Sequence, residues 1–208
     1  MPQITNEERT PQSAWAALKE GNRRFQTFNE ERPNTDFTRR MELTNGQNPI
    51  AVVLSCSDSR VPVELIFDQG LGDVFVIRTA GEIIDLSVLA SLEYAVEDLH
   101  VKVIVVLGHE SCGAVAATKS AMEGAGIPDG FRRVLVEKIS PSIMNARDAG
   151  KTTAAEFESH HVAETVDQII SRSPEVKNKL QQGQVGIVGV RYRLSDGYAE
   201  PVVEIGVD

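Results

Sequence analysis

The segment IAVVLSCSDSR, residues 50–60, joins a block of apolar residues to a run of polar ones. A second segment has the same organisation, because VKVIVVL at residues 101–107 leads into GHESCG at residues 108–113. Short blocks rich in valine and isoleucine are typical of strands that are buried on both faces of a parallel sheet. The two segments therefore predict an α/β fold with a polar motif at the carboxyl end of each strand.

The chain on either side of these segments continues the alternation of strands and helices. Further strands are predicted at Asp73–Ile77, Gln184–Val190 and 199–206, and further helices after Asp85, at 130–148, at 152–171 and from Pro174. Leu194–Gly197 has the composition of a hairpin turn into the last strand. This pattern predicts a mainly parallel central β-sheet flanked by helices, with an antiparallel edge strand. In the helix after Asp85, the residues expected on the buried side are Leu86, Leu89, Tyr94 and Leu99.

Residues 1–49 contain no predicted strand and form a helical arm before the domain of residues 50–208. Pro11 follows Thr10 as the first residue of an expected helix, and Trp15, Leu18 and Phe25 lie on one face of it. A second short helix is expected at residues 36–44. Because the arm has no strand of its own, its apolar face must lie either on the domain of the same chain or on a partner subunit, and we expect the arm to act in dimerisation.

The composition is that of an ordinary soluble domain, with 208 residues, 41% of them hydrophobic and 25% charged. The formal net charge of −9 argues against a nucleic acid or an anionic membrane surface as the partner. No apolar run reaches the roughly 18 residues of a membrane span, and the polar opening MPQITNEERT predicts no secretory signal. A cytoplasmic location is therefore expected.

Both cysteines of the chain stand in the polar motifs at the predicted strand ends. Ligand crevices of open parallel sheets lie outside the carboxyl ends of the strands, so Cys56, Asp58, His109 and Cys112 are expected to converge there. Two thiolates, an imidazole and a carboxylate suit zinc better than magnesium or calcium. The alternative is that both cysteines are ordinary small core residues.

The order of the motifs is similar to that of the β-class carbonic anhydrases. The resemblance rests on CSDSRV at 56–61, RTAG at 78–81, EYAV at 93–96 and GHESCGA at 108–114, and it covers nearly the whole chain. It implies reversible hydration of CO2 to bicarbonate and a proton, one Zn²⁺ per subunit, and an obligate dimer that often assembles into tetramers. It also implies that zinc-bound hydroxide is the nucleophile and that an Asp–Arg pair orients it.

By this resemblance, Cys56, His109 and Cys112 hold the zinc, and the fourth position belongs either to water or to Asp58. Two thiolates cancel the charge of the ion, so the site needs help from its surroundings to activate water. Arg60 supplies it by holding Asp58 away from the metal, which opens the fourth position.

The resemblance also implies a substrate pocket. Gln47 matches the glutamine that hydrogen-bonds CO2 or bicarbonate, and in a dimer it is contributed across the interface. Val53 stands where the bicarbonate-regulated subtype has a tryptophan, which argues against that form of regulation. The remaining pocket residues implied by the resemblance are Val61, Phe75, Ala80, Tyr94 and Gly113.

Two other functions are compatible with the same motifs. The same zinc chemistry would serve a hydrolase of CS2 or COS, and a non-catalytic zinc or bicarbonate-binding protein is a second alternative. A thiol oxidoreductase is disfavoured because the sequence has no Cys-x-x-Cys pair. His160 and His161 are adjacent on a predicted helix, point about 100° apart and are expected on a solvated face.

Overall fold

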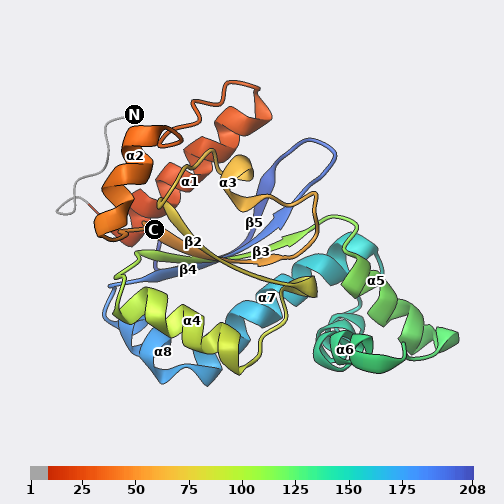
Figure 1. The fold of residues 1–208 in the computed structure, drawn as a ribbon. Helices are drawn as coiled ribbons and strands as arrows, with labels where there is room; N and C mark the ends of the chain where they lie inside the picture. The colour runs from red at the N-terminus through yellow and green to blue at the C-terminus, as the bar shows by residue number, and fades with distance from the viewer. Residues whose placement is uncertain (1–8) are drawn as a thin grey trace.

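The computed structural model describes residues 9–208 and contains one five-stranded sheet in the order β2-β1-β3-β4-β5 (Figure 1). The pairs β1–β2, β1–β3 and β3–β4 are parallel, whereas β5 runs antiparallel to β4 at the edge. The mainly parallel sheet with an antiparallel edge strand is thus confirmed. The strands are β1 Ala51–Cys56, β2 Val74–Thr79, β3 Val103–His109, β4 Gly186–Tyr192 and β5 Ala199–Ile205.

Every residue of β1, β3 and β4 is buried, as the apolar blocks predicted. Successive residues of these strands point to opposite faces of the sheet. Val53 and Val105 pack into a core cluster with Trp15 on one face, and Val52 and Ile104 pack into a second cluster on the other face. The sheet is therefore the middle layer of three.

Helices cover both faces and one end of the sheet. Figure 1 shows α1, α2 and α3 on one face, α4, α7 and α8 on the other, and α5 and α6 beyond the end of the strands. The helices are α1 Pro11–Gln26, α2 Phe37–Glu42, α3 Val63–Ile66, α4 Leu86–Glu97, α5 Gly113–Ser120, α6 Arg133–Asp148, α7 Ala154–Arg172 and α8 Pro174–Gln181.

Three helices begin where the sequence predicted, each after a capping side chain. Thr10 caps α1, Asp85 caps α4 and Ser173 caps α8 through side-chain hydrogen bonds to backbone N–H groups. The expected buried side of α4 is wrong at two positions, since Leu86 is 80% exposed and Tyr94 is 45% exposed. The helix instead buries Val88, Leu89, Leu92, Ala95 and Val96 against the sheet.

The helical arm is not separate from the rest of the chain. Trp15 is 1% exposed and Leu18 is fully buried, both within the core cluster that contains Val53 of β1. Of the two covers that the sequence allows for this face, the sheet of the same chain is the one observed. By contrast, α2 buries none of its residues. The first eight residues of the expected arm lie outside the described residues.

Within residues 9–208, no helix combines the length and the apolar character that a membrane crossing requires.

Candidate metal centre

Three potential metal ligands meet at the carboxyl ends of β1 and β3. Cys56 is the last residue of β1, His109 is the last residue of β3, and Cys112 is the N-cap of α5. One ligand atom from each residue lies within 4.8 Å of the others. The side chains are almost fully buried, with 5%, 0% and 2% of Cys56, His109 and Cys112 exposed. The convergence predicted for these three residues is confirmed.

The donor atoms of this cluster fit a metal ion. Nδ1 of His109 lies 2.8 Å from the carbonyl oxygen of Glu110 and donates to it, whereas the buried Nε2 has no hydrogen-bond partner. A buried ring nitrogen without a hydrogen-bond partner destabilises the fold unless a ligand binds to that nitrogen. Backbone hydrogen bonding at one ring nitrogen is also how metal-ligating histidines are held. With two thiols beside Nε2, the set suits zinc.

One thiol of the cluster loses its proton readily. The Cys112 thiol and the N–H of Gly81, which lies 3.3 Å from Sγ, donate to Cys56, and together with the adjacent His109 ring they lower its pKa to about 4. The hydrogen bond that it donates to Cys56 and its burial in turn raise the pKa of the Cys112 thiol. Without a metal, one of the two thiols keeps its proton. Metal binding requires both as thiolates, and a bound cation would stabilise the two negative charges side by side.

Asp58 and Arg60 form a forked ion pair next to the cluster. Arg60 donates from Nε to Oδ1 at 2.9 Å and from Nη2 to Oδ2 at 2.8 Å, and its backbone N–H donates to Oδ1 at 2.9 Å. These bonds hold the pKa of Asp58 well below its ordinary value, so the carboxylate is ionised. Oδ2 also lies 3.8 Å from Nε2 of His109. Of the two arrangements that the sequence left open, the structure shows Asp58 held by Arg60.

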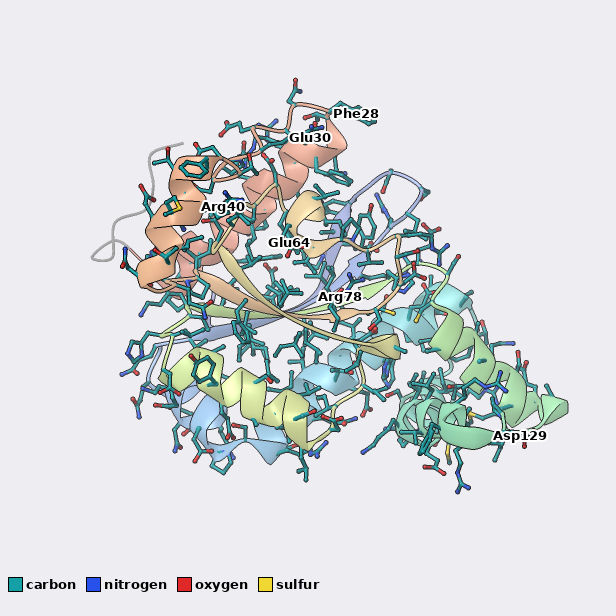
Figure 2. All side chains as sticks on the ribbon, viewed as in Figure 1. Phe28, Glu30, Arg40, Glu64, Arg78 and Asp129 are labelled. Carbon is teal, nitrogen blue, oxygen red and sulfur yellow. The ribbon has the colours of Figure 1, made fainter. Side chains whose placement is uncertain are left out.

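Arg78 fixes the turn that carries Asp58. It lies near the carboxyl end of β2 (Figure 2) and donates from Nε and Nη2 to the carbonyl oxygen of Cys56 at 3.1 and 2.9 Å. Nη2 also donates to the carbonyl oxygen of Asp58 at 2.7 Å. Sequence reasoning quoted the motif at 78–81 but did not assign this role to Arg78.

Three of the expected pocket residues lie near the cluster or in the core beneath it. Ala80 precedes Gly81, whose N–H contacts Cys56, and Gly113 begins α5 directly after Cys112. Val61 follows the Asp58 turn and is fully buried in the core cluster of α1.

The other three expected pocket residues lie at the opposite end of the sheet within one chain. Phe75 of β2 pairs with Val52 of β1, and Thr79 of β2 pairs with Cys56 of β1. Phe75 therefore lies four residues, or about 13 Å, along β2 from the residue that stands beside Cys56. The rings of Tyr94 and Phe75 lie 6.0 Å apart, and the exposed Gln47 precedes β1. A single chain therefore does not bring Gln47, Phe75 and Tyr94 to the cluster.

A layer of buried polar groups behind the cluster was missed in the sequence. His161 is 2% exposed and bonds Ser142 Oγ at 3.0 Å and the carbonyl oxygen of Gly81 at 2.9 Å, so its expected place on a solvated face is wrong. Burial lowers the pKa of His161 and raises that of Glu82 well above its ordinary value. Glu158, 4% exposed, belongs to the same layer. The helical periodicity of α7 places His161 on the same buried face as Phe157, Val162 and Ile169. This periodicity is the feature of the sequence that could have predicted its burial.

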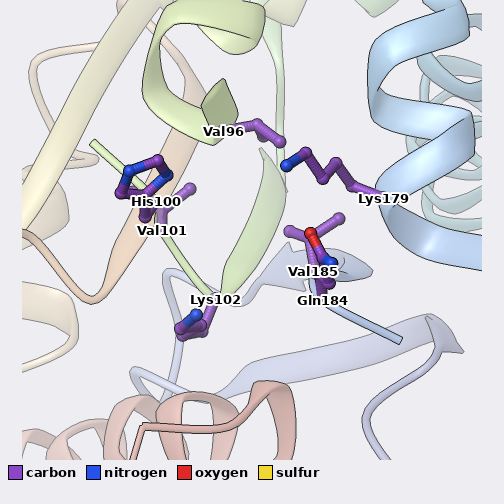
Figure 3. A pocket seen from close by; sticks show the side chains of 7 residues that line it. All are labelled: Val96, His100, Val101, Lys102, Lys179, Gln184 and Val185. Carbon is purple, nitrogen blue, oxygen red and sulfur yellow. The ribbon is translucent and has the colours of Figure 1, made fainter. Parts of the chain in front are cut away.

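A separate hollow lies at the other end of β3 and β4, where His100 and Lys102 precede β3 (Figure 3). None of the three clustered ligands lines it. The metal chemistry therefore belongs to the carboxyl ends of the strands. The lining residues are Val96, His100, Val101, Lys102, Lys179, Gln184 and Val185.

Comparisons with known proteins agree with this geometry. Residues 51–199 match the family model described as carbonic anhydrase. The chain is 52% identical over 190 residues to a carbonic anhydrase of Mycolicibacterium smegmatis, covering 91% of this chain and 92% of the relative. The fold is similar to that of the β-carbonic anhydrase CcaA, with a TM-score of 0.66 at 25% identity and coverage of 88% and 92%. It is also similar to a tetrameric β-carbonic anhydrase from Sordaria macrospora, with a TM-score of 0.70 at 23% identity and coverage of 91% and 96%.

Proposed function

This chain belongs to the β-class of the carbonic anhydrase family, and we propose how its own residues carry out the reversible hydration of CO2 to bicarbonate and a proton. The observation that carries the proposal is the buried triad of Cys56, His109 and Cys112 with Asp58 clamped beside it by Arg60. The reaction makes the chain a zinc lyase.

The three clustered residues would hold one zinc ion per chain. Zinc bound there supplies Lewis acidity, which lowers the pKa of a water molecule and makes it a nucleophile toward CO2. Cys56 and Cys112 provide the two thiolates, and His109 provides Nε2 while the Glu110 carbonyl fixes its ring. Two thiolates neutralise the charge of the ion and weaken its Lewis acidity. The activation of the water therefore also depends on the neighbouring side chains.

Asp58 orients the water and Arg60 keeps Asp58 in place. An ionised carboxylate accepts hydrogen bonds only, so Oδ2 of Asp58, next to the triad, binds a water through its hydrogen and directs the oxygen lone pair outward. Arg60 occupies both carboxylate oxygens from the outer side and prevents Asp58 from joining the three ligands.

The experiment that tests this division of roles is stopped-flow CO2 hydration by Arg60→Ala, with zinc content measured on the same sample. We expect kcat to fall about 10–100-fold at unchanged zinc content, the range typical of residues that orient a metal site. Arg60→Lys keeps the charge but loses the fork, so it should retain part of the activity. The control is Arg23→Ala, because Arg23 makes a forked pair with Glu20 on the surface of α1. Full activity in Arg60→Ala would refute the role.

We further propose that the enzyme works as a homo-oligomer, a dimer or a tetramer, in which a second copy supplies Gln47, Phe75 and Tyr94 to the pocket. Three large apolar side chains after α1 support this, since Phe28, Phe37 and Met41 are 88%, 66% and 49% exposed (Figure 2 shows Phe28). The Sordaria relative, described as tetrameric, points the same way. The molar mass of the particle in solution tests the proposal.

The two buried, unpaired thiols of the centre favour a reducing compartment, and we propose a cytoplasmic location. Fractionation of cells that express the chain tests it, and recovery with an oxidising compartment would contradict it.

A further inference from the structure

The loop between the second and third zinc-binding residues has an unfavourable backbone conformation. We call residues 109–113 the metal loop, since His109 and Cys112 are its ligand residues. Ser111 has φ +57°, in the left-handed region that residues with a side chain rarely adopt. A loop of this kind keeps its shape only where the surrounding structure fixes it.

Glu158 fixes the metal loop from the protein interior. Its Oε1 accepts a hydrogen bond from the backbone N–H of Ser111 at 2.8 Å. The side chain of Glu158 is 4% exposed and projects from α7, a helix of 19 residues. The bond therefore ties the strained residue of the loop to a rigid element 47 positions along the chain.

Arg191 in turn fixes Glu158. Its Nε donates to Oε2 of Glu158 at 2.8 Å, and its side chain is 9% exposed. Arg191 lies in β4 opposite Gly108 of β3, directly before the metal loop, and its Nη1 lies 3.5 Å from Oε2 of Glu200. A buried carboxylate held by a guanidinium and by a backbone N–H is fixed in one position.

The other side of the same loop residue contacts Arg60. Nη2 of Arg60 donates to the carbonyl oxygen of Ser111 at 3.3 Å and to Oδ2 of Asp58 at 2.8 Å. A chain of contacts thus runs from Arg191 through Glu158 and the backbone of Ser111 to Arg60, and so to Asp58.

We propose that Glu158, held by Arg191, is a positioning residue that sets the metal loop and, through the Ser111 carbonyl, the Asp58–Arg60 pair. The proposal rests on the proposed function, since it names what holds the zinc-binding and orienting groups in place. A buried ion pair that serves only the stability of the fold is the competing explanation.

The test compares Glu158→Gln and Glu158→Ala with Asp68→Asn. Asp68 is a matched control, because it is also buried and receives a guanidinium, from Arg24 at 2.6 Å, and backbone N–H groups, from Glu31 and Arg32. It fixes the segment after α1 and not the metal loop. The glutamine retains an acceptor for the Ser111 N–H, so it is the variant that keeps the fold if the alanine does not.

Two readouts besides activity follow the metal loop in the zinc-loaded protein. They are amide hydrogen exchange of the peptide that contains Ser111 and the rate of zinc release to a chelator. We expect both to rise in Glu158→Gln, with zinc release about 10–100-fold faster, and to rise further in Glu158→Ala. kcat should fall in the same order, with KM nearly unchanged. Asp68→Asn should leave loop exchange and zinc release as in the wild type.

Wild-type loop exchange and zinc release in Glu158→Gln would overturn the proposal, and so would equal changes in Asp68→Asn. Zinc content and CO2 hydration of the wild type, measured in the same series, report separately on the proposed function. A wild type without zinc or hydration would refute that function, whereas normal wild-type values with an insensitive loop would refute only the role of Glu158.

Discussion

Cys56, Asp58 and Arg60 stand at every second position from the last residue of β1 onward, so a thiol, a carboxylate and a guanidinium meet at the metal centre. The cluster gathers thiolates, and Asp58 adds a carboxylate 3.8 Å from His109. Neighbouring thiolates disfavour a further negative charge, whereas the hydrogen-bonded guanidinium of Arg60 lowers the pKa of Asp58 and keeps it ionised there. Arg60 therefore allows an orienting anion to exist beside a thiolate-rich site.

The buried His161 makes stability depend on pH. Burial lowers its pKa in the folded protein, whereas the unfolded chain protonates near pH 6.5. Below pH 6.5 the unfolded state binds a proton that the folded state does not, so the free energy of unfolding falls on acidification, by up to about 1.4 kcal/mol per pH unit. Above pH 6.5 this contribution is constant.

We expect His161→Gln to reduce this slope, because glutamine can bond Ser142 and Gly81 without titrating. Urea unfolding of the zinc-loaded protein at pH 7.5, 6.5 and 5.5 measures it. His100→Gln, at an exposed histidine, controls for the loss of a histidine elsewhere. Equal slopes in the wild type and in His161→Gln would show that His161 does not contribute.

The three ligand residues could be found from the sequence because each follows or ends an apolar strand, and parallel strands end at one edge of the sheet. Glu82, Glu158 and His161 could not be found in the same way. Their contacts join residues far apart in the chain, such as Ser111 with Glu158 and Gly81 with His161. Only the final packing of α7 against β3 and β4 brings these groups together.

At the scale of elements, α7 begins with a reciprocal capping box. Thr153 accepts from the N–H of Glu156, and Oε2 of Glu156 accepts from the N–H groups of Thr152 and Thr153 at 2.9 Å. These bonds lower the pKa of Glu156 to about 2. A lowered carboxyl pKa stabilises the fold above the unfolded value of about 4.3 and loses its effect as the pH falls toward 2.

Glu156→Gln should therefore lower the midpoint of thermal unfolding most at pH 7 and pH 4.5, and less at pH 3. Melting curves at the three pH values check this. Glu175→Gln, in the first turn of α8, controls for the loss of one charge near a helix start. A deficit in Glu156→Gln that does not shrink at pH 3 would contradict the capping role.

The positions of the five strands and of α1, α2, α4, α6, α7 and α8 followed from their sequence patterns, whereas α3, α5 and the buried face of α4 did not. Leu86 is the first residue of α4 and points away from the core, and Tyr94 packs on Phe75 of the edge strand β2. A helix over a sheet edge buries a narrow stripe, so apolar residues beside that stripe remain exposed. Periodicity alone does not fix where the stripe ends.

At the scale of the whole molecule, α1 belongs to the core, and the segment after it carries exposed apolar side chains. Phe37 and Met41 of α2 are the residues through which we expect copies to associate. Phe37→Glu combined with Met41→Glu should lower the molar mass measured by light scattering and reduce CO2 hydration, since Gln47, Phe75 and Tyr94 of a second copy are then lost. The core residue Trp15 is untouched, so the variant should stay folded.

Phe131→Glu is the control for this variant, because Phe131 is 96% exposed and precedes α6, away from α2. It should keep the wild-type mass and activity. Wild-type mass in the Phe37 and Met41 variant would show that copies associate through another surface.

The central claim is that zinc held by Cys56, His109 and Cys112 is required for CO2 hydration. The most direct measurement is zinc content together with stopped-flow CO2 hydration, on the wild type and on Cys112→Ala. We expect one zinc per chain and rapid hydration in the wild type, and the loss of both in Cys112→Ala, because a thiolate is a full ligand to the ion. Stoichiometric zinc and wild-type turnover in Cys112→Ala would contradict the claim.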